Sequence, residues 1–430
     1  MNMYSYQEAF GASDKTSRAM KKAIAQWFRL YYQQERSRET DPCQRIAYTV
    51  VNKLTKAVFS EYKASCREEA PQKWLQSLEE RKKEALQLAL TGGECYLKPC
   101  PTGTGFSYTL IPRDHALIFA RDSRGEPTDV GLAERTTLGK YYYTLLERRT
   151  VDAQGVLTIR NRLFRSGSSE NLGTETELSE HPQYRNLAKV SSCRLGSVGL
   201  SRMKTPMVNC VDGSQDSVAV FAPAVQLIQA IDENEAQLMG EFHRGQSRVF
   251  LSRDLLDREG KLTEDLFVGL DEDAQSVGMT IFAPQLRQQS FLERKQEYLR
   301  NVESVVGLKR GMLSDANMDE RTATEIAASQ ADFTLTVMDF QSMWQEAVEK
   351  TMALCGALAR VYGLAAAQDV TVQFDWGNGV LYDEEKIWQG YLQMVKDGLI
   401  APEVALGWRF GMPADTKEQR QLIREKYMPS

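Results

Sequence analysis

Histidine and carboxylate side chains are the residues of this sequence that could carry acid–base or metal chemistry. The three histidines, His115, His181 and His243, lie far apart and follow no regular spacing, so we expect surface or packing roles for them. Asp375 and Asp383 flank a Trp-Gly-Asn-Gly segment without the alternating oxygen ligands of a calcium loop. That pattern favours a turn, and we predict no metal site and no cofactor.

The sequence motifs of common enzyme classes are missing as well. The chain has no Gly-x-x-x-x-Gly-Lys-Ser/Thr phosphate loop, no Gly-x-Ser-x-Gly turn and no His-Glu-x-x-His motif. Cys95 and Cys100 have no second close pair of cysteines, which argues against a zinc site. We predict that the protein is not an enzyme.

Lys309 and Arg310 suit a different chemistry, which is contact with phosphate. They lie between Gly307 and Gly311, after one segment of helical periodicity and before another that begins near Thr322. Two compatible interpretations follow. The two cations stabilise the end of the preceding helix through its dipole, or they belong to a loop whose role the resemblance given below implies.

The first hundred residues show helical periodicity. Ser13 and Asp14 are candidate caps for the first helix. A second helix follows Pro42, and a third spans about 73–90 before a Gly-Gly stop. The basic residues on the other face of the first helix form either a solvated face or a patch for a nucleic acid or partner. They are Lys15, Arg18, Lys21, Lys22 and Arg29.

Short strand patterns dominate from Glu94 to about Ser191. They are rich in aromatic and β-branched residues and are separated by Gly and Asp clusters, which is typical of a β-rich unit. The runs are 95–98, 106–111, 141–146 and 156–159. Residues 165–217 are rich in serine, glycine and other polar residues, and we expect loops there.

Helical periodicity returns at Val220 and ends near Gly245. Two strand-like runs follow, 248–251 and 279–282, and the stretch 254–273 between them holds eight carboxylates and two basic residues. We predict a helix over 288–306 and then a much longer one from Thr322 to Tyr362, roughly 60 Å long at about 1.5 Å per residue. Two helices therefore bracket a small β segment.

Composition sets wider limits. The 430 residues, 42% apolar and 26% charged, are typical of a folded protein with more than one domain. Seven scattered cysteines indicate reduced thiols in a cytosolic compartment. No apolar run reaches membrane-spanning length and no leader pattern opens the sequence, so we expect no membrane association. A net charge of −5 argues against a tight static DNA binder, but not against a protein along which DNA slides.

This order of elements resembles the portal proteins of tailed double-stranded DNA bacteriophages. Four stretches, spanning most of residues 80–365, carry the resemblance. They are Ala-Leu-Thr-Gly-Gly-Glu-Cys-Tyr-Leu-Lys-Pro at 89–99, the helix and strand over 221–250, the helix and its Val-Gly-Leu end over 291–313, and Arg-Thr-Ala-Thr-Glu-Ile at 321–326. The segments 370–375 and 395–400 are also similar to the family, whereas the serine-rich region 165–200 departs from its pattern.

The resemblance implies an α+β portal fold. Its expected parts are a wing (1–218), a first stem helix (219–245), a clip (246–286), a second stem helix (287–306), a tunnel loop (307–321), a long wing helix (322–363) and a C-terminal strand with crown helices (364–430). The clip strands are too short to be stable alone, so we expect them to pair with strands of a neighbouring subunit.

The resemblance also assigns roles to residues. The tunnel loop, facing DNA, would carry Gly307, Lys309, Arg310, Gly311, Ser314 and Asn317. Stem positions are Asp232, Glu235, Glu241, Arg294 and Lys295. Clip residues that would dock terminase or a connector protein are Arg248, Asp254, Asp271, Glu272 and Asp273.

The function that the resemblance implies is a ring, dodecameric in capsids, at one capsid vertex. Terminase pumps double-stranded DNA through its channel without sequence preference, and the ring retains the DNA, releases it on ejection and joins the head to the tail. The implied partners are other copies of the chain, the terminase large subunit, major capsid or scaffolding protein and a head–tail connector protein. The implied location is the virion, after assembly in the host bacterial cytoplasm.

Two other classes of function stay open at this point. One is a structural protein of head morphogenesis that forms no channel, and images of a defined ring would separate it from a portal. The other is a nuclease in which Asp375 and Asp383 hold Mg²⁺, and substituting both would then abolish metal-dependent cleavage.

Overall fold

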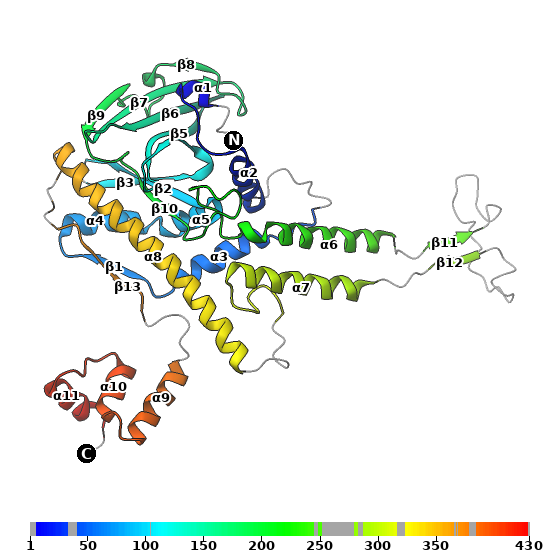
Figure 1. Cartoon of the computed structure of the whole chain (residues 1–430), viewed down its shortest axis with the longest axis vertical. Helices are drawn as coiled ribbons and strands as arrows, with labels where there is room; N and C mark the ends of the chain where they lie inside the picture. Colours follow the sequence, from blue (N-terminus) through cyan, green and yellow to red (C-terminus); the bar gives the residue numbers. More distant parts are fainter. Residues whose placement is uncertain are drawn as a thin grey trace. The chain divides into compact units, whose positions relative to one another are not determined.

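The structure, a computed structural model, describes residues 6–32, 41–103, 105–244, 248–251, 279–282, 287–315, 323–364, 367, 369–377 and 384–428. These residues divide into two units (Figure 1). The larger unit takes residues 1–58 and 65–373, and the smaller takes 59–64 and 374–430.

A six-stranded antiparallel sheet forms one part of the larger unit. Its order is β4 (Ala116–Arg121), β5 (Pro127–Leu138), β6 (Tyr141–Val151), β7 (Val156–Ser166) and β8 (Thr174–Thr176), and β9 (Val190–Arg194) also pairs with β7. Asp152 closes the turn between β6 and β7, because its Oδ1 accepts the N–H groups of Gln154 and Val156. A short 3-10 helix, Leu178–Glu180, lies between β8 and β9.

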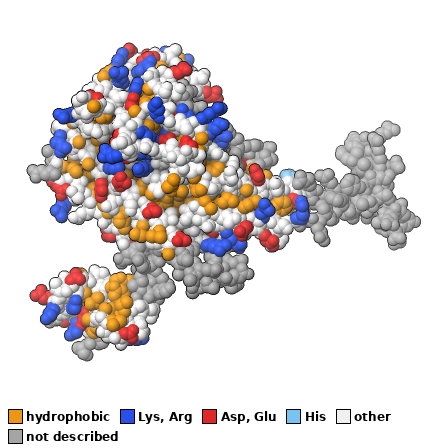
Figure 2. Space-filling model, viewed as in Figure 1, with side chains coloured by type: hydrophobic (Ala, Val, Ile, Leu, Met, Phe, Trp, Pro, Cys, Tyr) orange, Lys and Arg blue, Asp and Glu red, His pale blue; other side chains and the backbone are white. Residues whose placement is uncertain are grey.

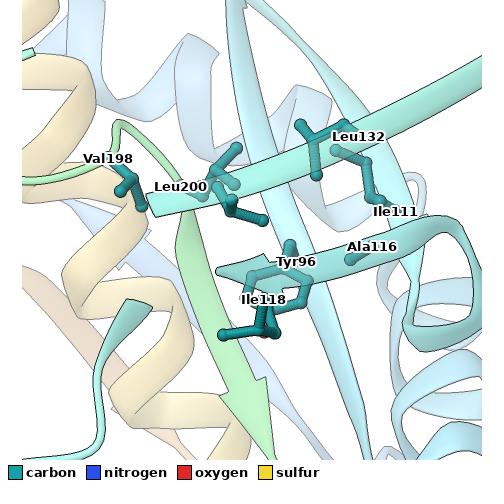
Figure 3. Close-up of a cluster of buried hydrophobic side chains, with 8 residues drawn as sticks. Tyr96, Ile111, Ala116, Ile118, Leu132, Val198 and Leu200 are labelled. Atoms are coloured by element: carbon teal, nitrogen blue, oxygen red, sulfur yellow. The ribbon is translucent and has the colours of Figure 1, made fainter. Parts of the chain in front are cut away.

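The two faces of this sheet pack in separate apolar cores, as alternation along a strand requires. On one face Phe119 packs against Phe10, with ring centroids 5.6 Å apart. On the other face Ile118 and Leu132 pack with Tyr96 of the neighbouring sheet (Figure 3). The N-terminal helix α1 (Gln7–Phe10) is thus held against the first core.

A three-stranded sheet and several helices form the second part of the larger unit. The strand order is β10 (Ser201–Lys204), β2 (Glu94–Pro101) and β3 (Phe106–Pro112). Helices α4 (Glu69–Glu79), α5 (Lys82–Gly92) and α8 (Ala323–Tyr362) pack against these strands. The hydroxyl of Ser201 donates to the Ala347 carbonyl at 2.9 Å, which ties β10 to α8. A 3-10 helix, Arg113–His115, connects β3 with β4.

Helix α2 (Arg18–Tyr32) packs beside α3 (Ile46–Val58) and α5. Its cap differs from the prediction, since the Oγ atom of Ser17 accepts the N–H of Met20 at 3.1 Å. Asp14, one of the predicted caps, instead accepts N–H groups from Thr16 and from Ile118 of β4.

Two antiparallel helices extend from the larger unit, with a two-stranded hairpin between them in the sequence (Figure 1). A 3-10 turn, Ala222–Ala224, leads into α6 (Val225–Arg244), and α7 (Gln288–Val306) returns beside it. The strands β11 (Arg248–Leu251) and β12 (Met279–Phe282) pair with each other. Both strands of this pair come from one chain, and pairing with strands of a neighbouring subunit stays a prediction.

The smaller unit is mainly helical, with α9 (Glu384–Lys396), α10 (Pro402–Phe410) and α11 (Lys417–Tyr427). Phe410 and Tyr427 stack with ring centroids 4.1 Å apart, and Tyr391 stacks on Trp408 at 5.1 Å. Strands β1 (Lys63–Cys66) and β13 (Val372–Asp375) form a separate two-stranded sheet.

The predicted mixture of helices and sheet is confirmed, but several elements differ from the prediction. Residues 165–217 were expected to be loops but contain β8, β9 and β10, which are short strands added to existing sheets. The predicted helix 73–90 is two helices, α4 and α5, interrupted at 80–81. The strands β4 and β5 had no counterpart among the predicted runs. Across the described residues, no helix is both long and apolar enough to span a membrane.

Candidate functional site

The helix pair α6–α7 and the turn after α7 hold most of the described residues that the sequence singled out. Apolar side chains of both helices are buried, among them Ile228 and Ile231 on α6 and Leu299 and Val302 on α7. The Asn234 amide donates to the carbonyl of Phe291 at 3.0 Å. The pair therefore combines apolar packing with a polar contact that sets the register of one helix against the other.

A polar cluster links this pair to the segment before α3. The backbone N–H of Gln44 donates to Asp232 Oδ1 at 2.9 Å. Lys295 Nζ donates to Gln44 Oε1 at 2.6 Å and to Glu235 Oε2 at 3.0 Å. Arg45, the next residue, has φ of 56°, a left-handed conformation that costs about 1–3 kcal/mol and persists only where the surrounding structure enforces it. Three predicted stem residues, Asp232, Glu235 and Lys295, thus meet at one junction.

The other two predicted stem residues make contacts nearer the helix surface. Glu241 accepts two hydrogen bonds from the Arg287 guanidinium, at 3.0 and 2.7 Å, and these raise the pKa of Arg287. Arg294 Nε donates to the hydroxyl of Tyr298 on its own helix at 2.8 Å. Since the Arg287 side chain is 73% exposed, we expect its ion pair to add little stability.

Glu303 organises the turn that follows α7. Its side chain is fully buried, and its Oε1 atom accepts the N–H groups of Gly311, Leu313 and Ser314. The Ser314 hydroxyl donates to Oε2 at 2.8 Å. Gln296 Oε1 accepts the N–H of Asp315 at 2.8 Å. The segment is therefore a folded turn against α7.

Gly307 joins this turn to α8. It ends α7 in the left-handed conformation, with φ of 75°, and its N–H bonds to the Glu303 carbonyl. A Cβ atom at this position would lie 2.4 Å from Oγ1 of Thr336 on α8. Only glycine therefore fits both the conformation and the close approach of the two helices.

Lys309 and Arg310 lie on this turn, Lys309 partly buried and Arg310 exposed. The Lys309 carbonyl accepts the N–H of Met312 at 3.1 Å. The structure thus gathers five of the six predicted tunnel-loop residues, Gly307, Lys309, Arg310, Gly311 and Ser314. The sixth, Asn317, lies outside the described residues.

The predicted clip positions are less fully placed. Arg248 lies in β11, opposite Phe282 of β12. Asp254, Asp271, Glu272 and Asp273 lie outside the described residues.

The residues considered for metal chemistry do not assemble where the structure describes them. Asp375 accepts the N–H of Gly377 at 2.9 Å, in keeping with a turn, and Asp383 lies outside the described residues. His181 packs between Tyr143 and Tyr184, with ring centroids 5.1 and 4.8 Å away. Across the described ranges, no group of three or more His, Cys, Asp or Glu side chains could hold a metal ion.

The basic face of α2 is balanced by carboxylates. Lys21 pairs with Asp14 at 3.0 Å. Lys22 and Arg29 line a groove of about 560 Å³ whose opposite wall includes Asp232 and Glu233 of α6. A groove with charges of both signs is a poor surface for phosphate, so the interpretation as a solvated face is favoured.

Two residues of this site, Glu303 and Gln44, were not predicted from the sequence. For Glu303, the sequence does contain a pattern that could have indicated its role. It falls on the apolar stripe of α7, in the spacing Leu299, Val302, Glu303, Val306, where a carboxylate must find hydrogen-bond donors. Gln44 had none, because its partners lie about 190 and 250 residues further along the chain.

Comparisons with known proteins agree with the class that the order of elements suggested, a phage portal protein. Residues 134–428 match the family model described as phage portal protein, SPP1 Gp6-like. The match covers more than half of the chain, so this protein belongs to that portal family. It is therefore a structural component of a phage-type particle.

A solved structure shows the same fold at low sequence identity. The chain is similar to a chain of the neck of a native GTA particle computed with C12 symmetry, with 12% identity and a TM-score of 0.51, over 96% of this chain and 99% of that one. It also matches a chain of the neck of an empty GTA particle computed with C6 symmetry, with 13% identity and a TM-score of 0.49, over 95% and 98%. A search of curated proteins found no match.

Proposed function

We propose that this protein is the subunit of a closed portal ring at one capsid vertex, and that double-stranded DNA passes through the ring. Membership of the portal family is the observation that carries the proposal. In this role terminase packages DNA through the ring, the ring retains the DNA until ejection, and head–tail connector proteins attach to it.

Exposed apolar surface supports association into a ring. Leu335 and Met338 of α8 are 61% and 53% exposed, and Leu292 and Val305 of α7 are exposed as well. Figure 2 shows hydrophobic side chains spread across the lower part of the larger unit. Apolar surface of this kind marks association sites, and head-to-tail contacts around an axis close into a ring. The C12 symmetry of the similar neck structure supports twelve subunits.

Mass photometry of the purified protein tests the ring. We expect one species at about twelve times the mass of the chain, and a ring with a central channel in negative-stain images. A monomer that stays monomeric at micromolar concentration would contradict the proposal.

We assign the parts of the portal to the elements as follows. Helices α6 and α7 form the stem, the segment 246–286 with β11 and β12 forms the clip, residues 307–321 form the tunnel loop and α8 crosses the wing. Residues 1–218 form the rest of the wing, and 364–430 form a C-terminal strand and crown. The antiparallel packing of α6 on α7 and the fold of residues 307–315 at their base support this assignment.

The channel must let DNA slide, so its contacts with phosphate must be weak. Each Lys or Arg contact with phosphate releases counterions and adds affinity. Lys309 and Arg310 provide two cations in a chain of net charge −5. Contacts with phosphate do not depend on the base sequence of the DNA. We therefore propose that these two side chains touch the DNA backbone in every subunit.

Replacing both residues by alanine tests this contact. Rings of Lys309→Ala/Arg310→Ala should assemble and dock terminase, but late packaging or retention of DNA should fall. The deficit relative to the parent should shrink at high salt, because salt weakens the contacts that only the parent makes. Lys82→Ala/Lys83→Ala removes the same charge from α5 and serves as a matched control. Normal packaging and retention by the first variant would remove the DNA role of these charges, and failure to form rings would make them structural.

The acidic stretch 254–273 is proposed as the docking surface for terminase and later for a connector protein. Reversing the charges of Asp271, Glu272 and Asp273 should impair packaging while leaving the rings intact. Normal packaging by this variant would indicate that the carboxylates only keep the segment soluble.

A further inference from the structure

The buried carboxylate of Glu303 is the clearest feature of this structure that membership of the portal family does not explain. Burying a charge is costly unless hydrogen bonds replace the lost water. Here the described donors are three backbone N–H groups and one hydroxyl, all from residues 311–314. Successive N–H groups that converge on one anion form a strong, charge-assisted arrangement.

Through these hydrogen bonds, one side chain of α7 holds the backbone segment that follows the helix. Ser314 lies 11 residues after Glu303, and both its N–H and its hydroxyl bond to that carboxylate. Leu308 is buried, and its N–H bonds to the Glu303 carbonyl at 2.8 Å. Lys309 and Arg310 therefore lie on a segment that is anchored on both sides to the same residue.

We propose that Glu303 is the positioning residue that fixes the turn bearing Lys309 and Arg310, so that each subunit of the ring presents these cations to DNA in one arrangement. The positioning of the turn rests on the contacts above. The presentation to DNA rests on the proposed function. A Cβ atom at Gly307 would clash with Thr336, so the start of the fixed turn lies close against α8.

Hydrogen exchange in the full-length protein tests the positioning directly. In Glu303→Gln the backbone N–H groups of Gly311, Leu313 and Ser314 lose a charged acceptor, and their exchange should accelerate about tenfold or more. Glu297→Gln is the matched control, because Glu297 is a surface carboxylate of the same helix, 62% exposed. Its exchange over 308–315 should equal that of the parent.

Ser314→Ala keeps the test possible if Glu303→Gln fails to fold. It removes one bond to Oε2 and leaves the three backbone bonds to Oε1, so we expect a smaller acceleration in the same peptide. Unchanged exchange of residues 311–314 in folded Glu303→Gln would overturn the proposal.

Packaging separates this proposal from the proposed function. Glu303→Gln rings should lose retention as Lys309→Ala/Arg310→Ala rings do, and the triple variant should lose no more. Retention that falls in the alanine variant but not in Glu303→Gln, despite faster exchange, would overturn the positioning role toward DNA. A third outcome is faster exchange in Glu303→Gln with normal DNA retention in both Glu303→Gln and Lys309→Ala/Arg310→Ala. It would support Glu303 as the anchor of the turn and overturn the DNA contact of the proposed function.

Discussion

The Nε atom of Arg113 lies 2.8 Å from Oε1 of Glu94, and neither side chain has any surface exposed to solvent. Arg202 also contacts this carboxylate, and the hydroxyl of Tyr96 donates to it at 2.9 Å. Glu94 starts β2, Arg113 lies between β3 and β4, and Arg202 belongs to β10. One buried carboxylate therefore joins segments of the larger unit that are far apart in the sequence.

The pKa of Glu94 makes the stability of this unit sensitive to acid. Burial alone would raise the pKa, but Arg202, Arg113 and Arg121 lower it to about 2. Because the folded pKa lies below the unfolded value, this stabilisation is complete above about pH 4.5 and is lost as pH falls toward 2. We expect about 3 kcal/mol from this group, measured by denaturant unfolding at fixed protein concentration over that pH range.

Glu94→Gln should destabilise the larger unit at neutral pH. It leaves buried arginines without their carboxylate, which costs about 3–5 kcal/mol. The dependence of the free energy of unfolding on pH should become weaker but not vanish, because a second buried carboxylate also contributes to it. Burial raises the pKa of Glu147, but Arg149 and Lys98 lower it to about 2. Glu84→Gln, at a carboxylate 55% exposed, is the control and should cost less than about 0.5 kcal/mol. An equal loss in both variants would contradict a special role for the cluster.

Gly307→Ala should destabilise the contact between α7 and α8. The left-handed backbone costs about 1 kcal/mol for alanine, and the new Cβ would lie 2.4 Å from Thr336 Oγ1. Gly363→Ala is the matched control, because Gly363 has φ of 65° and open space around its Cβ position. Unfolding midpoints should fall further for the first variant than for the second.

A double-mutant cycle with Thr336→Ala isolates the clash. Removing Oγ1 should recover a large part of the loss in Gly307→Ala, with a coupling of about 1 kcal/mol or more. The same Thr336 change should not rescue Gly363→Ala. Additive effects at positions 307 and 336 would mean that the backbone conformation alone requires glycine.

Lys295→Met should weaken the junction between the helix pair and the segment before α3. It removes the donor shared by Gln44 and Glu235, and we expect a loss of about 1–2 kcal/mol in the free energy of unfolding. The neighbouring change Arg294→Met alters a contact with Tyr298 on the same helix and should cost less than about 0.5 kcal/mol. The reverse order of the two losses would contradict the junction.

Thr416→Ala should loosen α11 in the smaller unit. Thr416 and Gln419 form a reciprocal capping box at the start of this helix, and losing such a cap costs about 1 kcal/mol. Hydrogen exchange of residues 417–427 should accelerate, while exchange in the larger unit should not change. Gln421→Ala, on the exposed middle of the helix, should leave exchange close to that of the parent.

Local patterns were enough to place many elements of this protein. The apolar spacing along α6, α7 and α8 reflects which side of a helix is buried, and this can be read within a few turns. The end of α7 at Gly307 and the basic pair after it were also visible in the sequence. The order of helices and strands in turn carried the resemblance to portal proteins, which the family match confirmed.

Tertiary structure decided what holds those elements in place. The strands β9 and β10 carry weak local patterns and form because β7 and β2 offer them edges. The sequence determined that Glu303 lies on a buried stripe, but not that residues 311–314 would fold back to bond it. Gln44 likewise meets Asp232 and Lys295 only after folding. A buried polar group is stabilised by whichever partner the folded chain brings within about 3 Å, and sequence separation does not limit that choice.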